Sequence, residues 1–336
     1  MENSKVTVCC LVYNHARFIR ETMDGILMQN TNFEFDIVIH DDASTDGTEQ
    51  ILWEYKERYP DKITLLTEKE NQYSKGGKIM KGMLLPKVTG KYYCICEGDD
   101  FWTDPDKLQR QYDALEAHPE CSFSVHNVQC VDEESAPAGK VFPPVKLNPG
   151  VLTAEEYIGY EVGQSMWLFQ TTCFLFRTDY LHEYLYDTPE FIDVYKKAGD
   201  LQRVLFYLTK GNVFYIDQFM SAYRIGVKGS VGERLVINKS FRINQRKGYI
   251  ATLESYNEYT NGRFEKDIRS YQLRAEFGYL LDEGNYSAIK DPKFSEIYSQ
   301  ISAKQKIKIT LFGIFPAGEQ LYEKVKLLLW NIRHKR

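Results

Sequence analysis

Three carboxylates lie close together in one short stretch of the sequence, Glu97-Gly98-Asp99-Asp100. They follow an apolar run, 92–96, whose residues favour a buried strand. Ligands of open α/β sheets bind at the carboxyl ends of the strands, and clustered anions repel each other unless a cation is bound. Carboxylate oxygens suit Mg2+ or Mn2+, which also bridge to phosphate oxygens. The stretch predicts either a divalent-metal site or a solvated acidic turn ahead of the helix expected near Pro105.

A second pair of acids, Asp41-Asp42, follows another apolar run, 35–40. The loop after it, 43–47, leads into a stretch of helical character at 48–59. Both acidic stretches are therefore expected at strand ends on one edge of a sheet, where they could bind a ligand together. Alternatively, Asp41 and Asp42 only cap the helix that begins at Thr48, because negative charge is favourable near a helix N-terminus.

Alternating strands and helices fill the first two thirds of the chain. This alternation predicts βαβ units, and hence an α/β fold with a mostly parallel central sheet flanked by helices. Strands are expected at 5–12, 35–40, 63–67, 91–96, 121–131, 169–176, 212–216 and 220–224, and helices at 17–29, 48–59, 104–118 and 200–209. The proline-rich segment 133–150 is expected to be a loop or insertion, and 153–156 is typical of a capped helix start. The pattern then changes to long helices at 235–259, 264–282 and 294–302, which predict a C-terminal helical extension.

The charge of the chain is unevenly distributed. The 336 residues carry a formal net charge of -5. From Ile301 onward there are eight basic and two acidic residues, a net charge of +6, which leaves -11 for the first 300 residues. A negative body argues against general nucleic-acid binding, whereas a basic tail is typical of contact with an anionic surface.

The cysteines and the N-terminus indicate a cytoplasmic protein. The seven cysteines show no metal-binding pattern of repeated pairs, and several lie inside expected core strands, where a thiol acts as a small apolar residue. This usage favours a reducing compartment. The chain runs from Met1 directly into an expected strand, without the features of a signal peptide. No stretch reaches 18 apolar residues, so we expect no membrane-spanning helix.

Four motifs give the chain a resemblance to a known family. The first motif is Tyr13-Asn14, at the end of the first expected strand, and the second is the segment 39–48, Ile-His-Asp-Asp-Ala-Ser-Thr-Asp-Gly-Thr, which follows the second. The third is the acidic segment with Phe-Trp at 97–102, after a later strand. The fourth is Gly199-Asp200, at the start of an expected helix. In this order and spacing they resemble the inverting family 2 glycosyltransferases of the GT-A fold, in particular bacterial enzymes of capsule, O-antigen and other surface polysaccharides. The resemblance covers about residues 5–225.

The resemblance implies a Rossmann-like GT-A catalytic domain at 1–228, with a nucleotide-sugar half at about 1–105 and an acceptor half at about 106–228. A helical region at 229–336 would follow. The implied reaction moves a sugar from a nucleotide-diphosphate sugar, UDP-sugar favoured, to a saccharide or lipid-linked saccharide acceptor. Mg2+ or Mn2+ would neutralise the charge that grows on the leaving diphosphate.

The same resemblance implies which residues bind the donor. Asp42 takes the place of the acid that recognises the base, because a carboxylate can accept a hydrogen bond from the imide N–H of uracil or thymine, and Asp41 would shape its loop. Asp99 is the first candidate metal ligand and Asp100 the second, while Glu97 stands where the family usually has an aspartate. The full set of donor-binding candidates is Leu11, Tyr13, Asp41, Asp42, Glu97, Gly98 and Asp99.

Inversion also requires a general base for the attacking hydroxyl, usually Asp or Glu. Asp200 matches the family's position for this base, although it could instead only cap the helix 200–209. Contacts with the acceptor are expected from Trp102, Trp167, Thr171 and Thr172.

One segment departs from the family's pattern. Many relatives carry a histidine shortly after a Tyr-Arg pair near the end of the catalytic domain, but the segment 223–228, Tyr-Arg-Ile-Gly-Val-Lys, has none. Arg224 or Lys228 could meet the diphosphate instead; otherwise this segment is only a domain boundary.

The C-terminal segment 317–336 combines apolar residues at helical spacing with basic residues and Trp330. It predicts a helix lying on the inner face of the cell membrane, or a helix packed on the catalytic domain with exposed lysines. The first alternative would make the enzyme peripheral to the membrane.

Three other functions are alternatives to glycosyl transfer. A nucleotidyltransferase generally has a glycine-rich phosphate loop after its first strand, but positions 13–17 hold no glycine. A dinucleotide oxidoreductase is disfavoured because Gly-x-Gly-x-x-Gly is absent there. A non-catalytic module that binds sugar nucleotide, or scaffolds an assembly, stays open as the alternative.

Overall fold

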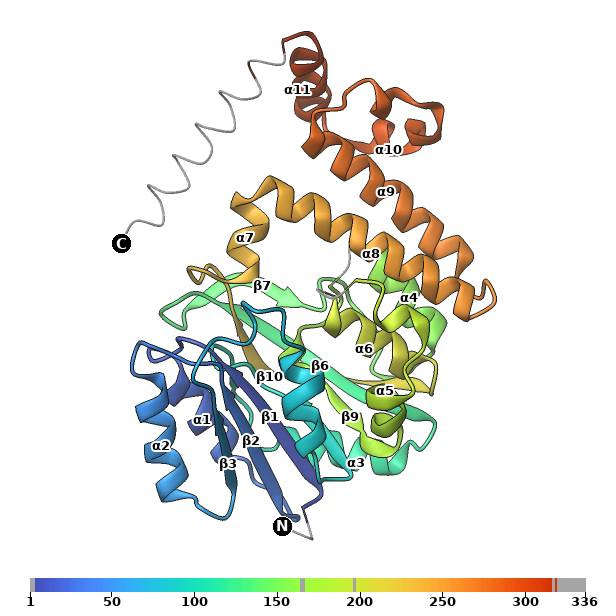
Figure 1. The fold of residues 1–336 in the computed structure, drawn as a ribbon. Helices are drawn as coiled ribbons and strands as arrows, with labels where there is room; N and C mark the ends of the chain where they lie inside the picture. The colour runs from blue at the N-terminus through green and yellow to red at the C-terminus, as the bar shows by residue number, and fades with distance from the viewer. Residues whose placement is uncertain (1–3, 164–166, 196–197, 316–317, 319–336) are drawn as a thin grey trace. The chain divides into compact units, whose positions relative to one another are not determined.

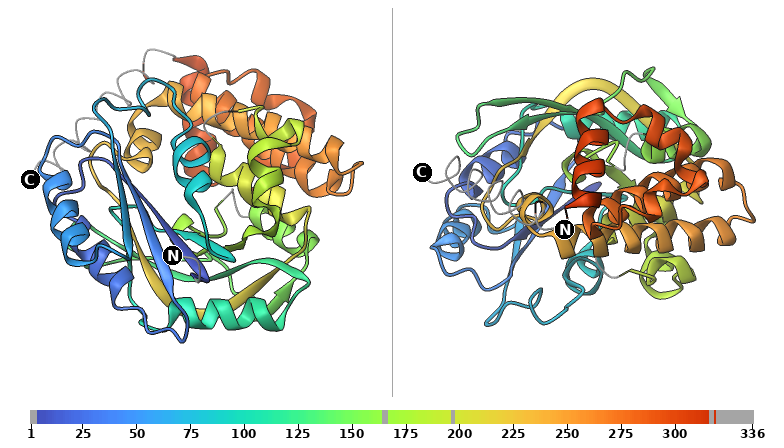
Figure 2. Two further views of the ribbon diagram at one scale, coloured as in Figure 1. Left: turned by 60° about the horizontal axis from the view of Figure 1, so that its bottom comes forward. Right: turned by 90° about the horizontal axis from the view of Figure 1, so that it is seen from above.

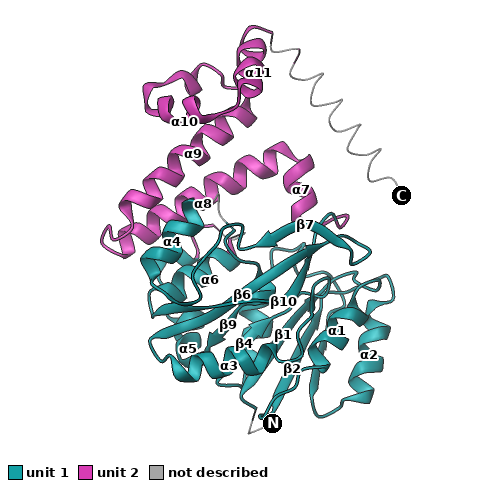
Figure 3. Cartoon of the chain, turned by 180° about the vertical axis from the view of Figure 1, so that it is seen from behind, with its two compact units in different colours: residues 1–192, 200–226 teal, residues 193–199, 227–336 magenta. Residues whose placement is uncertain are grey.

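The computed structural model spans residues 1–336 and describes residues 4–163, 167–195, 198–315 and 318. The chain divides into two compact units (Figure 3). The first comprises Met1–Ile192 and Asp200–Gly226, and the second comprises Asp193–Gly199 and Val227–Arg336. The short segment 193–199 thus belongs with the C-terminal unit, which sequence reasoning had no means to detect.

A ten-stranded sheet forms the framework of the first unit within the described residues (Figure 1). Its main path is β3-β2-β1-β4-β9-β6-β10-β5, with β7 paired to β6 and β8 paired to β10. The strands are β1 (Val6–Val12), β2 (Phe35–Asp41), β3 (Ile63–Thr67), β4 (Tyr92–Ile95), β5 (Phe101–Trp102), β6 (Cys121–Val131), β7 (Pro137–Phe142), β8 (Gly150–Leu152), β9 (Leu175–Arg177) and β10 (Asn212–Arg224). Neighbours among β3, β2, β1 and β4 pair in parallel, as do β6 and β10; the other pairings are antiparallel.

Six α-helices accompany this sheet in the described part of the chain. They are α1 (Ile19–Leu27), α2 (Thr48–Arg58), α3 (Lys107–Ala117), α4 (Ala154–Gly163), α5 (Leu181–Tyr186) and α6 (Gly199–Leu208). Shorter 3-10 helices lie at Leu85–Lys87, Thr171–Cys173, Thr178–Tyr180 and Glu190–Ile192, and a π-helical turn lies at Met80–Leu84. Helices α1 and α2 lie side by side along the β1-β2-β3 part of the sheet (Figure 2).

The parallel strands are buried on both faces, which explains why their sequences are almost continuously apolar. Every residue of β2 and β4, and all but one of β1, is buried, as expected for parallel strands covered on both faces. One apolar cluster joins these strands to helices α1, α2 and α3 through residues such as Met23, Leu52 and Leu108. The carboxyl ends of β1, β2 and β4 therefore have a rigid support.

Three sequence-based assignments need correction. The segment expected as a loop at 133–150 contains β7, whose mostly exposed residues lack the apolar alternation that signals a strand. The strand expected at 169–176 is reduced to β9, because the chain first makes a 3-10 turn at Thr171–Cys173. The two strands expected at 212–216 and 220–224 form a single strand, β10. The polar residues that separate the two expected segments lie where the pairing of β10 with β6 shifts in register.

The second unit is helical in its described residues. Its helices are α7 (Val231–Ile237), α8 (Lys239–Tyr259), α9 (Glu265–Glu283), α10 (Ser295–Gln300) and α11 (Ala303–Ile314), with 3-10 turns at Ala288–Lys290 and Pro292–Phe294. The helix expected at 235–259 is divided between α7 and α8, because the Asn238 side chain accepts the N–H of Phe241 and begins a new helix there. An apolar cluster around Phe277, Phe294 and Ile309 holds α9, the 3-10 turns and α11 together.

No helix in the described ranges is long and apolar enough to cross a bilayer. The segment 317–336, predicted to form a basic amphipathic helix, lies outside the described residues except for Gly318, so its membrane contact stays a prediction.

Candidate active site

The loops after β1 and β2 hold each other by side-chain hydrogen bonds to backbone groups. The N–H of Asn14 donates to Ser44 Oγ (2.8 Å), and the N–H of Thr45 donates to Asn14 Oδ1 (2.8 Å). Asn14 and Ala43 both have left-handed backbones, with φ of 56° and 63°. The two neighbouring strands thus end in one joined structure, in the place where sheets of this kind bind ligands.

Asp46 adds a second set of bonds between the same loops. Its carboxylate accepts the N–H of Ala16 (3.0 Å) and the N–H of Thr48 (3.1 Å), while Thr48 Oγ1 accepts the N–H of His15 (2.9 Å). Partial burial opposes it, but the hydrogen bonds from Thr48 and Ala16 lower the pKa of Asp46 below its ordinary value. Asp46 therefore stays ionised and joins the segment before α1 to the first residue of α2.

Asp41 and Asp42 have different surroundings, although they are adjacent. Asp41 accepts both the hydroxyl and the N–H of Ser44, and burial raises the pKa of Asp41 above its ordinary value, although those hydrogen bonds lower it in part. Asp42 is 1% exposed, and its two oxygens accept the N–H groups of Gln72 (2.7 Å) and Tyr73 (3.0 Å). Asp42 thus anchors a loop, and its recognition of a base stays a prediction.

Leu11 and Val12 connect the two acidic strand ends. The carbonyl of Leu11 accepts the N–H of Gly98 (3.0 Å), and the carbonyl of Val12 accepts the N–H of Asp42 (2.9 Å). The end of β1 therefore lies between the acids that follow β2 and those that follow β4. Tyr13, the next residue, is 44% exposed, so its ring is available for stacking on a base.

Gly98 allows the acidic segment to approach β1. A Cβ atom at this position would lie 2.7 Å from His15 Nδ1 and 3.0 Å from a methyl group of Val12. The close approach brings Asp99 Oδ2 to 3.9 Å from His15 Nε2. Sequence reasoning missed His15, because its only signal was its place beside the Tyr13-Asn14 motif.

The acidic segment is electrostatically strained. Burial is the main cause that raises the pKa of Glu97 to about 8, and the negative charges of Asp200 and Asp99 raise it further. The nearby Arg203 acts in the opposite direction. Burial, followed by the charges of Asp99 and Glu97, also raises the pKa of Asp100 well above its ordinary value. The segment therefore favours bound protons or a bound cation.

Asp100 and Asp99 differ as candidate metal ligands. Asp100 is 1% exposed; its Oδ1 accepts the N–H of Arg224 (2.9 Å), and its Oδ2 is buried without a partner among the described residues. The side chain of Asp99 is 20% exposed. The described residues contain no group of three or more His, Cys, Asp or Glu side chains that could hold a metal by themselves. A divalent ion would fit here only with further oxygen ligands, such as those of a phosphate.

Asp200 lies in the first turn of α6, which begins at Gly199, rather than at the cap position. Its Oδ1 is 2.5 Å from a guanidinium nitrogen of Arg203, which is 3% exposed. The side chain of Asp200 is 47% exposed. Helix α6 packs on β4, because the rings of Tyr207 and Tyr93 lie 6.3 Å apart between centroids, and the charge of Asp200 acts on Glu97, which follows β4. The structure therefore brings Asp200 together with the acidic end of β4.

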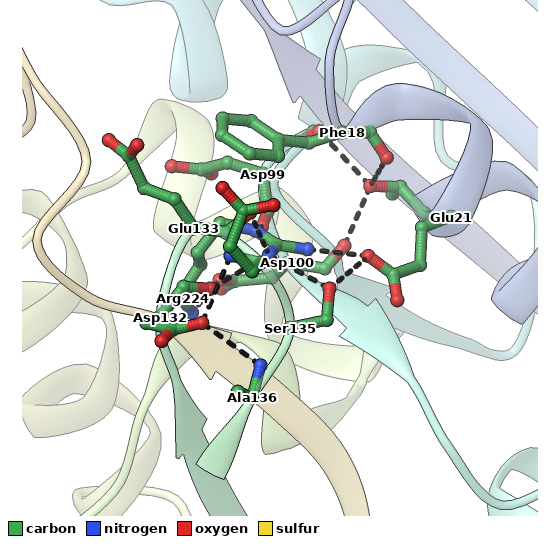
Figure 4. A network of polar contacts seen from close by, with 12 residues as sticks. Phe18, Glu21, Asp99, Asp100, Asp132, Glu133, Ser135, Ala136 and Arg224 are labelled. Carbon is green, nitrogen blue, oxygen red and sulfur yellow. Dashed lines mark hydrogen bonds and ion pairs between the residues drawn. The ribbon is translucent and has the colours of Figure 1, made fainter. Parts of the chain in front are cut away.

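Arg224 is the centre of a hydrogen-bond network beneath this segment (Figure 4). Its guanidinium donates to the carbonyls of Asp99 (2.9 Å) and Asp132 (2.9 Å), to Ser135 Oγ (3.0 Å) and to Glu21 Oε2 (2.6 Å). Its side chain is 1% exposed. This corrects the prediction that Arg224 meets the diphosphate, because its donors already bind protein groups. Lys228 is exposed and belongs to the second unit, so its contact with diphosphate stays a prediction.

Two of the four expected acceptor residues are inaccessible. Trp102 is 2% exposed and its ring lies 4.1 Å from Lys107 Nζ, and Thr172 is fully buried. This burial corrects their assignment as acceptor contacts; the aromatic signal of Trp102 came from core packing. Trp167 and Thr171 are partly exposed, and acceptor contact stays a prediction for them.

The model of the family named Glycosyl transferase family 2 matches residues 7–185 of the chain, which covers both loops and the acidic segment. The chain belongs to this family and is a glycosyltransferase. Among its relatives, the Uncharacterized protein Rv1520 of Mycobacterium tuberculosis is 28% identical over 271 residues, which are 78% of this chain and 70% of that protein. The Putative teichuronic acid biosynthesis glycosyltransferase TuaG of Bacillus subtilis is 29% identical over 135 residues, 40% of this chain and 51% of that protein.

Solved structures confirm the fold. The structure of Staphylococcus aureus TarS 1–349 in complex with UDP has a TM-score of 0.54 at 15% identity, covering 90% of this chain and 77% of that one. The mannosyltransferase PcManGT of Pyrobaculum calidifontis, in complex with GDP-Man and Mn2+, has a TM-score of 0.53 at 16% identity, covering 99% and 87%. The predicted α/β GT-A fold with a C-terminal helical extension is therefore confirmed.

Proposed function

We propose that the chain catalyses inverting transfer of a sugar from a nucleotide-diphosphate sugar, UDP-sugar favoured, to a saccharide or lipid-linked saccharide acceptor in bacterial surface polysaccharide synthesis. Membership of the glycosyltransferase family supports the reaction class. The name of the relative TuaG, which refers to teichuronic acid, supports a polysaccharide product. The nucleotides bound by TarS and PcManGT support a nucleotide-sugar donor.

The donor half of the proposed site is the joined end of β1, β2 and β4. Tyr13 would stack on the base, and Asp42 would read it once its carboxylate exchanges the N–H groups of Gln72 and Tyr73 for the base. Asp99 would hold Mg2+ or Mn2+, because it is the more exposed of the two metal candidates. When bound, the ion would supply positive charge where the diphosphate leaves.

The proposal depends above all on the packing of α6 against β4, with the half-exposed Asp200 in the first turn of that helix and its charge acting on Glu97. As general base, Asp200 would accept the proton of the attacking acceptor hydroxyl. The ion pair with Arg203 holds the carboxylate in place for that task.

The experiment is the substitution Asp200→Asn. A panel of UDP-, GDP- and dTDP-sugars with Mn2+ would first identify the donor by thermal shift, because a ligand that binds the native state raises Tm. We expect Asp200→Asn to keep the donor-induced shift but lose at least about 100-fold in kcat, since general bases contribute roughly 10²–10⁴-fold.

The matched control is Asp179→Asn, an exposed carboxylate of the same unit, which should leave kcat unchanged. Undiminished transfer by Asp200→Asn would refute its role as base. Donor binding by the wild-type protein without transfer or hydrolysis, across a broad acceptor panel, would favour the non-catalytic module instead.

We also propose a cytoplasmic location at the inner face of the cell membrane. The basic composition of 317–336 supports this location, as does a lipid-linked acceptor. Deleting 317–336 should release the protein from membrane fractions; an unchanged distribution would contradict the proposal.

A further inference from the structure

Helix α11 exposes most of its apolar side chains to solvent. It spans Ala303–Ile314, and Ile309 is its one buried residue. Ile307, Leu311 and Ile314 are 60%, 51% and 63% exposed. Because these three residues are spaced by four and three positions, they form one apolar stripe along the helix. A surface helix of a globular protein normally turns such a stripe toward the core.

The opposite side of α11 is already packed against its own unit. Ile309 lies two positions from both Ile307 and Leu311, which puts it on the other side of a helix with 3.6 residues per turn. It belongs to the apolar cluster, around Phe277 and Phe294, that holds the second unit together. Since Ile309 fixes which side of the helix faces inward, the apolar stripe faces away from this unit.

The helix that carries the stripe is firmly begun. The N–H of Gln305 donates to Ser302 Oγ (3.2 Å), and the N–H of Ser302 donates to Gln305 Oε1 (3.0 Å). This reciprocal pair is a capping box, which satisfies two backbone donors at the helix start. The stripe is therefore in place before any partner binds, so little ordering entropy opposes docking.

The charge of α11 has one sign. Its sequence contains lysines but neither Asp nor Glu. Lys304 is exposed and lies three residues before Ile307, hence beside the apolar stripe. The Nζ of Lys306 donates to the carbonyl of Ser299 (2.9 Å), a neutral group that does not offset its charge. An apolar stripe accompanied by lysines is typical of helices that lie on anionic lipid.

We propose that the apolar stripe of α11 docks on an anionic lipid bilayer, with the helix lying in the plane of the headgroups and Lys304 beside their phosphates. The apolar side chains supply the burial, and the lysines supply the preference for negative headgroups. This contact adds to the membrane location proposed from the composition of 317–336, and it does not depend on that segment or on the sugar-nucleotide site.

Charge disfavours two other occupants of the stripe. A second copy of the chain, related by a two-fold axis, would place stripe against stripe and bring the two copies of Lys304 together. The segment 317–336 contains five Lys or Arg residues and two Glu residues, so it is itself positive. An anionic bilayer has the opposite sign and attracts the lysines instead.

The test measures cosedimentation of the full chain with vesicles of phosphatidylglycerol and, separately, of phosphatidylcholine, without metal or sugar donor. We expect binding to the anionic vesicles alone, weakening as salt is added. Leu311→Gln and Ile307→Gln should each weaken this binding at least about 10-fold, because each removes an apolar side chain from the contact. Lys304→Gln should weaken it roughly fivefold.

Two matched controls come from the same unit. Val236→Gln replaces an apolar side chain of α7 that is 48% exposed, and Lys266→Gln replaces an exposed lysine of α9. Both variants should bind the anionic vesicles as the wild type does. Because all the substituted side chains are exposed, we expect unchanged Tm values, so weaker binding would not reflect unfolding.

Leu311→Cys gives a direct readout of the stripe, because all seven native cysteines are buried. The new thiol should react rapidly with a maleimide in lipid-free protein and be protected when phosphatidylglycerol vesicles are added. Protection without lipid would overturn the proposal. It would identify a second copy as the occupant if it increases with protein concentration, and 317–336 if it does not.

The proposal also fails if neither kind of vesicle binds, or if Leu311→Gln and Ile307→Gln bind the anionic vesicles like the wild type. In the second case, any remaining lipid contact would belong to another part of the chain. None of these measurements uses a sugar donor, so their result is separate from that of the Asp200→Asn experiment.

Discussion

Arg224 holds together three segments that are far apart in the sequence. Its guanidinium reaches α1 at Glu21, the turn after β6 at Ser135 and the acidic segment at Asp99. The sequence marked position 224 as a site of interest but could not reveal this role, since the partners become neighbours only in the folded sheet. Acids at strand ends were easier to predict, because strand polarity alone puts them on one edge.

Replacing Arg224 by lysine should destabilise the protein markedly. Lysine keeps the charge but cannot reproduce the several directed donors of the guanidinium, and breaking a buried ionic network costs on the order of 3 kcal/mol. Chemical denaturation would measure the loss. Arg17→Lys is the control, because Arg17 is 50% exposed and its ion pairs with Glu133 and Glu134 lie at the surface, where such pairs contribute little to stability. Equal stability of the two variants would contradict the role given to Arg224.

Glu161 should make stability depend on pH. It is 7% exposed, its Oε2 accepts the N–H of Leu168 (2.8 Å), and burial raises its pKa to about 7, although that hydrogen bond lowers it in part. Because the folded state holds the proton more tightly than the unfolded state, this group's contribution is fully present below about pH 4.5 and is lost as pH rises to about 7. The loss is on the order of 3 kcal/mol.

Glu161→Gln keeps an acceptor for Leu168 and removes the charge, so its unfolding free energy should fall less than that of the wild type between pH 4.5 and 8. Denaturant titrations across this range measure the difference. Parallel pH profiles for the two proteins would show that Glu161 does not titrate as described.

At the scale of elements, α1 and β5 approach each other so closely that one glycine is required. A Cβ atom at Gly25 would lie 2.8 Å from the carbonyl oxygen of Trp102 and 2.9 Å from its nitrogen. Gly25→Ala should therefore destabilise the protein by roughly 1–3 kcal/mol, as overpacking does, despite the better helix propensity of alanine. Calorimetric Tm measures the effect. Gly159→Ala in α4, with open space around it, should instead be neutral or stabilising; the same loss at both positions would refute the argument.

The elements differ in how well the sequence predicts them. The strand 121–131 and the strand 63–67 were predicted with their observed bounds, because each is rich in β-favouring residues and begins shortly after a proline, Pro119 or Pro60, that ends the preceding helix. β7 was missed, since it is an exposed strand held by pairing with β6 rather than by an apolar pattern. A pairing partner that lies elsewhere in the fold is not visible in a local window of sequence.

At the scale of the whole molecule, the sequence pattern changes after Gly232 from alternating strands and helices to long helices, and this change predicted a helical C-terminal part. That the segment 193–199 belongs with this part could not be predicted. The GT-A fold could be predicted because motifs and strand order agree, whereas the positions of Trp102 and Thr172 relative to solvent could not. Whether a side chain is buried depends on which elements pack over it in the folded protein. Aromatic residues occur both in protein cores and in sugar-binding sites, so their type alone does not distinguish the two.

All seven cysteines are free and buried, which gives a prediction for the entire chain. Burial raises the pKa of Cys94 to about 12 and likewise that of Cys173, so few thiolates form near neutral pH. A disulfide-exchange reagent should label the native protein slowly, at well below one thiol per chain, and label seven thiols in guanidinium. Rapid labelling of any native thiol, at the rate of a free cysteine, would contradict the burial.

The left-handed backbone of Ala43 has a cost that the fold evidently tolerates. Glycine adopts such a conformation freely, whereas an L-residue such as alanine loses roughly 1–2 kcal/mol. The bonds among Asp41, Ser44 and Asn14 hold the conformation nevertheless. Consequently, the peptide groups that would receive a nucleotide are set in position during folding, and little conformational entropy is left to lose when a substrate arrives.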